Sequence, residues 1–136
     1  MGGFMAGFHR VLLVGISVLT LFAFGCSSNK PIYNIAGAPV ATNKANPTLE
    51  DVAAAIQRAG AGLGWQMQST APGRMIGTLS LRNHQAVVDV SYTPKTYSIS
   101  YKTSNNLDAD GKTIHGNYNG WIQNLDKAIQ TQLRLL

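Results

Sequence analysis

Between residues 63 and 102 the chain alternates apolar and polar positions in four short runs. The runs are residues 63–68, 75–82, 86–92 and 97–102. Turn-forming residues such as Pro72 and Gly73 separate them. Alternation with a period of two is the signature of strands with one buried face and one wet face. The short connections favour antiparallel neighbours, so the pattern predicts a four-stranded antiparallel meander.

Apolar residues at helical spacing flank this region on both sides. Thr48 is a suitable N-cap, and Asp51 three positions later completes a capping-box pattern ahead of a helix over residues 49–59. A second apolar stripe runs through residues 117–136 and predicts a longer helix there.

The two predicted helices must bury their stripes, and the apolar face of the meander is the surface available to them. We therefore predict an α+β, two-layer domain over residues 48–136. Both helices would cover one face of the sheet, in the order α-β-β-β-β-α.

The short run Asn117-Tyr118-Asn119-Gly120-Trp121 allows two interpretations. Its amides and aromatic rings are groups that could hold a sugar. Alternatively, one of the two asparagines caps the second helix while Tyr118 and Trp121 anchor the core. The pattern favours the structural interpretation.

Residues 26–47 are predicted to be a tether, with Pro31, Pro39 and Pro47 interrupting any regular element. A flexible coil of this length has an r.m.s. reach of about 25 Å. The apolar side chains within residues 31–35 leave open that this part docks on the domain as an edge strand.

The N-terminal 25 residues have the layout of a secretory signal peptide. His9 and Arg10 end a short first region, residues 11–24 are apolar, and Gly25 is small. The apolar run is shorter than the about 20 residues that a membrane-spanning helix needs. An uncleaved membrane anchor is the alternative interpretation.

The residues Phe22-Ala23-Phe24-Gly25-Cys26 resemble a bacterial lipobox. The resemblance implies that the Cys26 sulfur receives a diacylglycerol and that the chain is cut before Cys26. It also implies further acylation of the new amino group, and two or three acyl chains anchor a protein firmly where one does not. Ser27-Ser28 resembles the start of lipoproteins sent to the outer membrane.

Composition narrows the range of functions. The 136 residues include 11 basic and 6 acidic ones, for a formal net charge of +5. The basic residues are scattered and form none of the Lys/Arg-rich runs that mark nucleic-acid patches, so nucleic acid is not an expected partner. One cysteine permits no intramolecular disulfide.

Few residues could carry chemistry. His84 and His115 are the histidines beyond the predicted signal peptide, and no G-x-S-x-G motif is present. The loop with Asp108 and Asp110 partly matches a calcium-loop pattern, but Asn117 stands where the bidentate Glu is needed. We expect no enzymatic activity, no metal and no cofactor. The alternative is a small-ligand-binding, metal-binding or weakly catalytic periplasmic domain that uses both histidines and the Asp108/Asp110 loop.

The polar face of the meander is the candidate binding surface. It is expected to be rich in hydroxyl groups and mildly basic, and it would meet a polymer or a partner protein, or simply water. Its candidate residues are Arg74, Arg82, Ser98, Ser100 and Lys102.

A wider resemblance follows from runs spread over most of the chain beyond Cys26. They are Gly64-Trp65, Arg82-Asn83-His84, Val88 to Tyr92, Tyr97 to Tyr101, Ile114-His115 and Tyr118 to Trp121. This pattern is similar to that of a family of small proteobacterial lipoproteins of uncharacterised function, which supplies no mechanism or ligand. Together the resemblances imply a lipoprotein of the bacterial outer membrane whose domain faces the periplasm. We expect a non-enzymatic binding or assembly module with an envelope protein or peptidoglycan as partner.

Overall fold

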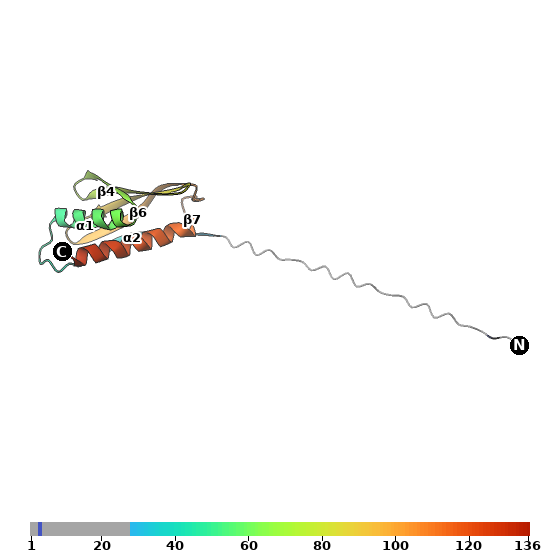
Figure 1. The fold of residues 1–136 in the computed structure, drawn as a ribbon, viewed down its shortest axis with the longest axis horizontal. Coiled ribbons are helices and arrows are strands. Elements are labelled where there is room, and N and C mark those ends of the chain that lie inside the picture. Colours follow the sequence, from blue (N-terminus) through green and yellow to red (C-terminus); the bar gives the residue numbers. More distant parts are fainter. Residues whose placement is uncertain (1–2, 4–27) are drawn as a thin grey trace.

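The computed structural model describes Gly3 and residues 28–136. The remainder of the predicted signal peptide, Cys26 and Ser27 lie outside the described residues. The described part is an α+β domain with two helices and antiparallel strands (Figure 1). Its elements are β1 (Asn29–Pro31), β2 (Ile35–Pro39), α1 (Leu49–Gly62), β3 (Gln66–Ala71), β4 (Arg74–Leu81), β5 (His84–Tyr92), β6 (Thr96–Asn105), β7 (Thr113–His115) and α2 (Gly116–Arg134).

The strands form a five-stranded sheet in the order β2-β6-β5-β4-β3 and a two-stranded sheet of β1 and β7. The four predicted strands correspond to β3–β6, so the meander itself is confirmed. The prediction of a four-stranded sheet is wrong because β2 pairs with β6, with Ile35 opposite Ile99. This pairing buries Ile35 and covers the edge of β6 that would otherwise be open.

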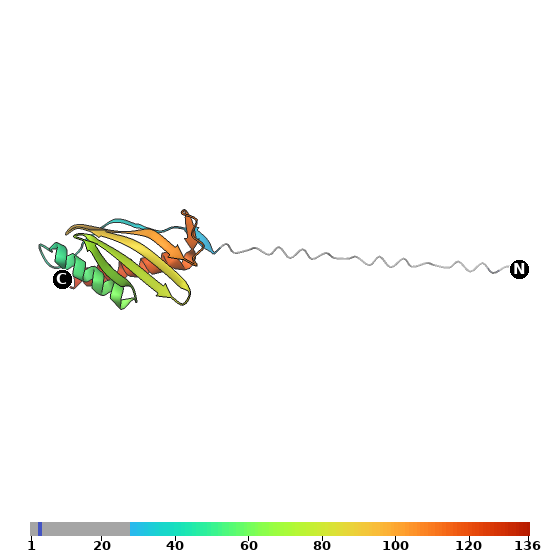
Figure 2. The same cartoon turned by 90° about the horizontal axis from the view of Figure 1, so that it is seen from above.

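Both helices lie on the same side of the five-stranded sheet (Figures 1 and 2). The predicted alternation is confirmed on this side, where Met75 and Leu79 of β4, Val88 and Val90 of β5, and Ile99 of β6 are buried. The opposite face of the sheet therefore carries the intervening side chains.

Helix α1 begins with the predicted capping box. The Thr48 hydroxyl accepts from the Asp51 backbone N–H at 3.1 Å, and the Asp51 carboxylate accepts from the Thr48 N–H at 2.8 Å. The Lys44 ammonium, 2.6 Å from the same carboxylate, is the main cause that lowers the pKa of Asp51. Reciprocal satisfaction of the first backbone donors explains why the helix begins at Leu49.

Helix α2 is capped by His115, whose Nδ1 accepts from the Asn117 N–H at 3.3 Å. The expectation that Asn117 or Asn119 is the cap is wrong. Asn119 instead holds the N-terminal segment: its Nδ2 donates to the Pro31 carbonyl at 2.9 Å, and its Oδ1 accepts from the Tyr33 N–H at 3.1 Å.

The prediction of a flexible tether over residues 26–47 is wrong for its described part. Ile32 donates its backbone N–H to the Lys112 carbonyl at 2.9 Å, and Val40 donates its backbone N–H to the Lys95 carbonyl at 2.8 Å. Strands β1 and β2 complete the attachment. Residues 28–40 are therefore attached to the domain rather than free. The segment 31–35 is docked, as the alternative had it, but the edge strand itself is β2 at residues 35–39, and residues 32–34 connect it to β1 without being part of a strand. Pro31 and Pro39 fit here because edge strands leave backbone positions that need no donor.

Two buried tyrosines permit a paired test of polar burial. The Tyr97 hydroxyl donates to the Asp126 carboxylate at 2.5 Å. The buried Tyr118 hydroxyl has no hydrogen-bond partner in the described structure, and its ring packs edge-on against Tyr101 at 5.7 Å between centroids.

We expect Tyr97→Phe to lower the free energy of unfolding by about 1.5–3 kcal/mol, because a hydrogen bond to a charged group is lost. Tyr118→Phe should raise it by about 1 kcal/mol, because an unsatisfied buried hydroxyl is removed. Urea unfolding of both variants measures the two changes. Destabilisation by Tyr118→Phe would show that its hydroxyl is satisfied in solution.

Candidate functional site

The face of β3–β6 that points away from the helices is the first candidate, and we call it the open face. Its side chains form rows across the strands. Arg74, Ser91 and Ser98 make one row in register, and the next consists of Ile76, Asp89 and Ser100. No helix or strand of residues 28–136 covers this face, so it is accessible over four strands.

Charge on the open face centres on one weak ion pair. Lys102 Nζ lies 3.4 Å from Asp89 Oδ1, and both side chains are about half exposed, at 46% and 52%. Exposed pairs of this kind contribute little stability. A shallow depression of about 190 Å³ lies beside the pair and includes Thr70, Arg74 and Ser91 in its lining. A charged partner could therefore replace the Asp89 contact at small cost.

The structure places most of the predicted binding residues on this face. Arg74, Ser100 and Lys102 are exposed there, while Ser98 is half-buried and its hydroxyl accepts from the Gly37 N–H at 2.9 Å. Arg82 does not belong to the face. It forms the β4–β5 turn with Asn83 and has a positive φ of 55°, so strand alternation does not extend to it.

The two histidines, far apart in sequence, meet at the opposite end of the domain from the C-terminus. The His84 and His115 rings are stacked with centroids 6.5 Å apart and planes at 26°. His84 Nδ1 lies 2.7 Å from the Asn106 carbonyl oxygen, so we assign its proton to Nδ1, which leaves Nε2 as a free acceptor. His115 Nδ1 is occupied by the Asn117 N–H.

The aspartate loop next to the histidines is organised by its own backbone. The Asp110 carboxylate accepts from the N–H groups of Lys112 and Thr113 at 2.8 and 2.6 Å, and from the Thr113 hydroxyl at 3.1 Å. The bond from the Thr113 N–H is the main cause that lowers the pKa of Asp110. Among the described residues, no three His, Cys, Asp or Glu side chains form a cluster, so neither Asp108 nor Asp110 joins the two histidines as a third ligand. The loop therefore follows ordinary turn chemistry.

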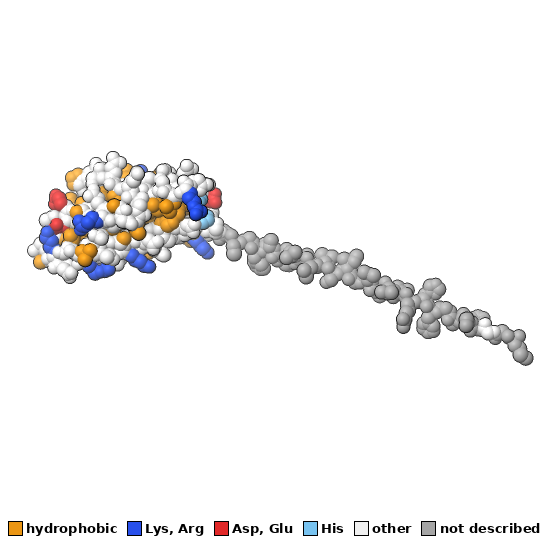
Figure 3. Space-filling model, in the orientation of Figure 1, with side chains coloured by type: hydrophobic (Ala, Val, Ile, Leu, Met, Phe, Trp, Pro, Cys, Tyr) orange, Lys and Arg blue, Asp and Glu red, His pale blue; other side chains and the backbone are white. Residues whose placement is uncertain are grey.

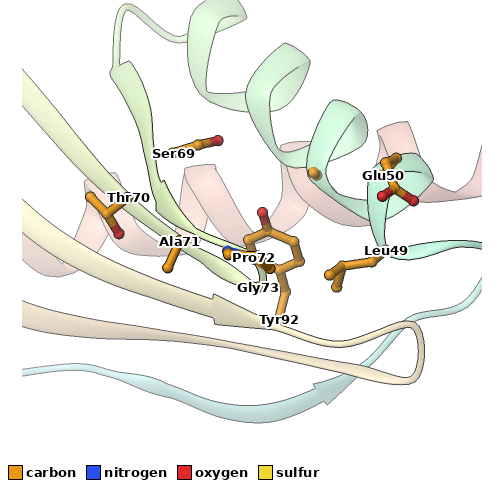
Figure 4. A pocket seen from close by; sticks show the side chains of 9 residues that line it. Leu49, Glu50, Ser69, Thr70, Ala71, Pro72, Gly73 and Tyr92 are labelled. Atoms are coloured by element: carbon orange, nitrogen blue, oxygen red, sulfur yellow. The ribbon is translucent and has the colours of Figure 1, made fainter.

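A hollow of about 400 Å³ that the sequence did not predict lies between the start of α1 and the β3–β4 turn (Figure 4). In Figure 4 the Tyr92 ring stands between Leu49 and the turn at Pro72 and Gly73. Tyr92 and Glu50 are the ionisable residues that line this hollow. Burial raises the pKa of Tyr92. The lining comes from the first turns of α1, the end of β3, the β3–β4 turn and the end of β5. Hydropathy patterns do not show that these four segments meet.

The chain matches no protein-family model, and no curated protein or solved structure is significantly similar to it. Within residues 28–136, neither helix is long and apolar enough to cross a bilayer. The interpretation of function therefore rests on the residues and their arrangement.

Proposed function

We propose that this chain is a lipoprotein of the bacterial outer membrane, anchored through acylated Cys26 and exposed to the periplasm. It acts without catalysis as a binding or assembly module, and an envelope protein or peptidoglycan is its partner. The open face carries the contact, through Arg74, Ser100 and Lys102.

The observation that carries this proposal is the asymmetry of the five-stranded sheet. Helices α1 and α2 cover one face of the sheet (Figure 2). The other face carries hydroxyl, amide and charged side chains, with the half-buried Ile76 and Val87 among them. The weak Asp89–Lys102 pair and the exposed Arg74 side chain supply charge for an anionic or hydroxyl-rich partner. A face of this composition suits a wet, reversible interface.

The double variant Arg74→Gln/Lys102→Gln tests the face. We expect cross-linking in native envelope membranes to capture about ten-fold less partner, equivalent to about 1.4 kcal/mol of binding free energy. The matched control is Lys95→Gln/Lys127→Gln, which removes the same charge from exposed positions outside the open face. Equal capture by the folded test variant, or an equal loss in the control, would contradict the proposal.

The stacked histidines favour a second candidate function, binding of a small ligand or a metal ion at the His84–His115 pair. The free Nε2 of His84 is its best ligand atom. Calorimetric titration of the protein with Zn²⁺ and Ni²⁺ tests this candidate. Binding that is lost in His84→Gln would support it, whereas no heat above the buffer blank would exclude a metal-binding role.

A further inference from the structure

The end of the domain that holds β1 and β7 brings together three segments, residues 28–31, 82–84 and 106–116, which we call the β1–β7 end. Strand β1 pairs with β7, with Asn29 opposite His115. The Gly116 N–H donates to the Ser28 carbonyl at 2.8 Å, and the Asn106 side chain donates to the Asn83 carbonyl at 3.4 Å. The segment 106–116 thus connects the β4–β5 turn with Ser28 and β1.

This end lies very close to the proposed lipid anchor. Cys26 precedes Ser28 by two residues, and two extended residues span at most about 7 Å. That distance is shorter than the Debye length of about 8 Å at physiological ionic strength. Acyl chains on Cys26 would therefore keep the β1–β7 end within the electrostatic reach of the lipid headgroups.

The exposed side chains of the β1–β7 end include long basic ones, which suit contact with anionic groups such as phosphate. Lys30, Arg82 and Lys112 are exposed here, as are Asp108 and Asp110. Figure 3 shows basic and histidine atoms, with some acidic ones, gathered at the end next to the grey residues. The Asp110 carboxylate keeps its negative charge but is fixed in place by three donors of its own loop, whereas the longer lysine and arginine stems can extend toward phosphate.

We infer that the β1–β7 end docks on the phosphate headgroups of the bilayer that carries the Cys26 anchor, through Lys30, Arg82 and Lys112. The inference rests on the proposed lipidation. Strands β4–β6 run along the domain from this end toward the end that holds the C-terminus (Figure 2). Docking therefore stands the open face upright on the membrane and turns the hollow at α1 away from it.

The test uses the lipidated full chain in vesicles of phosphatidylethanolamine with phosphatidylglycerol, or of phosphatidylcholine alone. A fluorophore is attached at Asn83→Cys in the β4–β5 turn, or at Asn46→Cys in the loop before α1, and headgroup-spin-labelled lipid quenches it. We expect stronger quenching at position 83 than at position 46, and a larger difference in the anionic vesicles.

Charge variants then identify the contact. A basic residue beside an anionic surface multiplies its occupancy by about five, so Lys30→Gln/Arg82→Gln/Lys112→Gln should lower the ratio of docked to undocked domain by about a hundred-fold. The control Lys95→Gln/Lys127→Gln/Arg134→Gln removes equal charge elsewhere and should leave the ratio unchanged. Asp108→Asn should raise the ratio about five-fold, and Asn tolerates the positive φ of this position, 50°.

The outcomes separate the two proposals. An intact mass without acyl groups on Cys26 would overturn both of them. Acylated protein with equal quenching at positions 83 and 46, or with the same response in both triple variants, would overturn the docking alone.

Discussion

Cys26→Ala is expected to remove the protein almost completely from the outer-membrane fraction. Alanine has no sulfur to form the thioether bond with diacylglycerol, and without acyl chains the described domain has no membrane-spanning helix to hold it. The chain should accumulate as a precursor that still carries residues 1–25. Separation of inner and outer membranes followed by immunoblotting measures both effects.

Ser27→Ala provides the matched control for this experiment, because it changes the adjacent residue and keeps the thiol of Cys26. Normal processing and outer-membrane recovery are expected for it. Recovery of Cys26→Ala in the outer membrane at the level of the unchanged protein would contradict lipid anchoring.

Ile99→Ala is expected to cost about 2–5 kcal/mol of the free energy of unfolding, through lost burial and a residual cavity. Ile99 is fully buried in β6 and lies opposite Val90 of β5 and Ile35 of β2. The cost is a large part of the about 5–15 kcal/mol that stabilises a typical domain. The melting temperature should fall by about 10–20 °C.

Ser100→Ala is the control for Ile99→Ala, since the next residue on the same strand points to the open face. Its effect on the free energy of unfolding should stay within about 0.5 kcal/mol. Calorimetry of both variants measures the difference. Similar melting temperatures for the two variants would mean that the assigned faces of β6 are wrong.

Hydropathy alone predicted α1, α2 and β3–β6, because each has a clear period and the four strands are joined by short turns. It could not assign β1, β2 and β7. These strands have only three to five residues and pair with partners far away in sequence, and β1 and β2 also contain Pro31 and Pro39. Their pairing depends on tertiary contacts such as the Asn119 side chain, which holds the backbone of Pro31 and Tyr33.

Some candidate site residues could likewise be placed from local sequence patterns, and others could not. Strand parity placed Arg74, Ser100 and Lys102 correctly on one face, because side chains alternate strictly within a strand. The same alternation wrongly placed Arg82 on this face, because strand β4 ends at Leu81. His84 and His115 lie close together because β7 pairs with β1 and because the His84 ring bonds to the Asn106 carbonyl. These are contacts between distant segments, so no local sequence pattern predicts them.

The intact mass of the protein extracted from envelope membranes shows whether Cys26 is the acylated first residue of the mature chain. We expect a chain that begins at Cys26 and carries a diacylglycerol and an additional acyl group. A chain that retains residues 1–25, or that has an unmodified Cys26, would contradict the claim that this domain is a lipoprotein held at the membrane by its first residue.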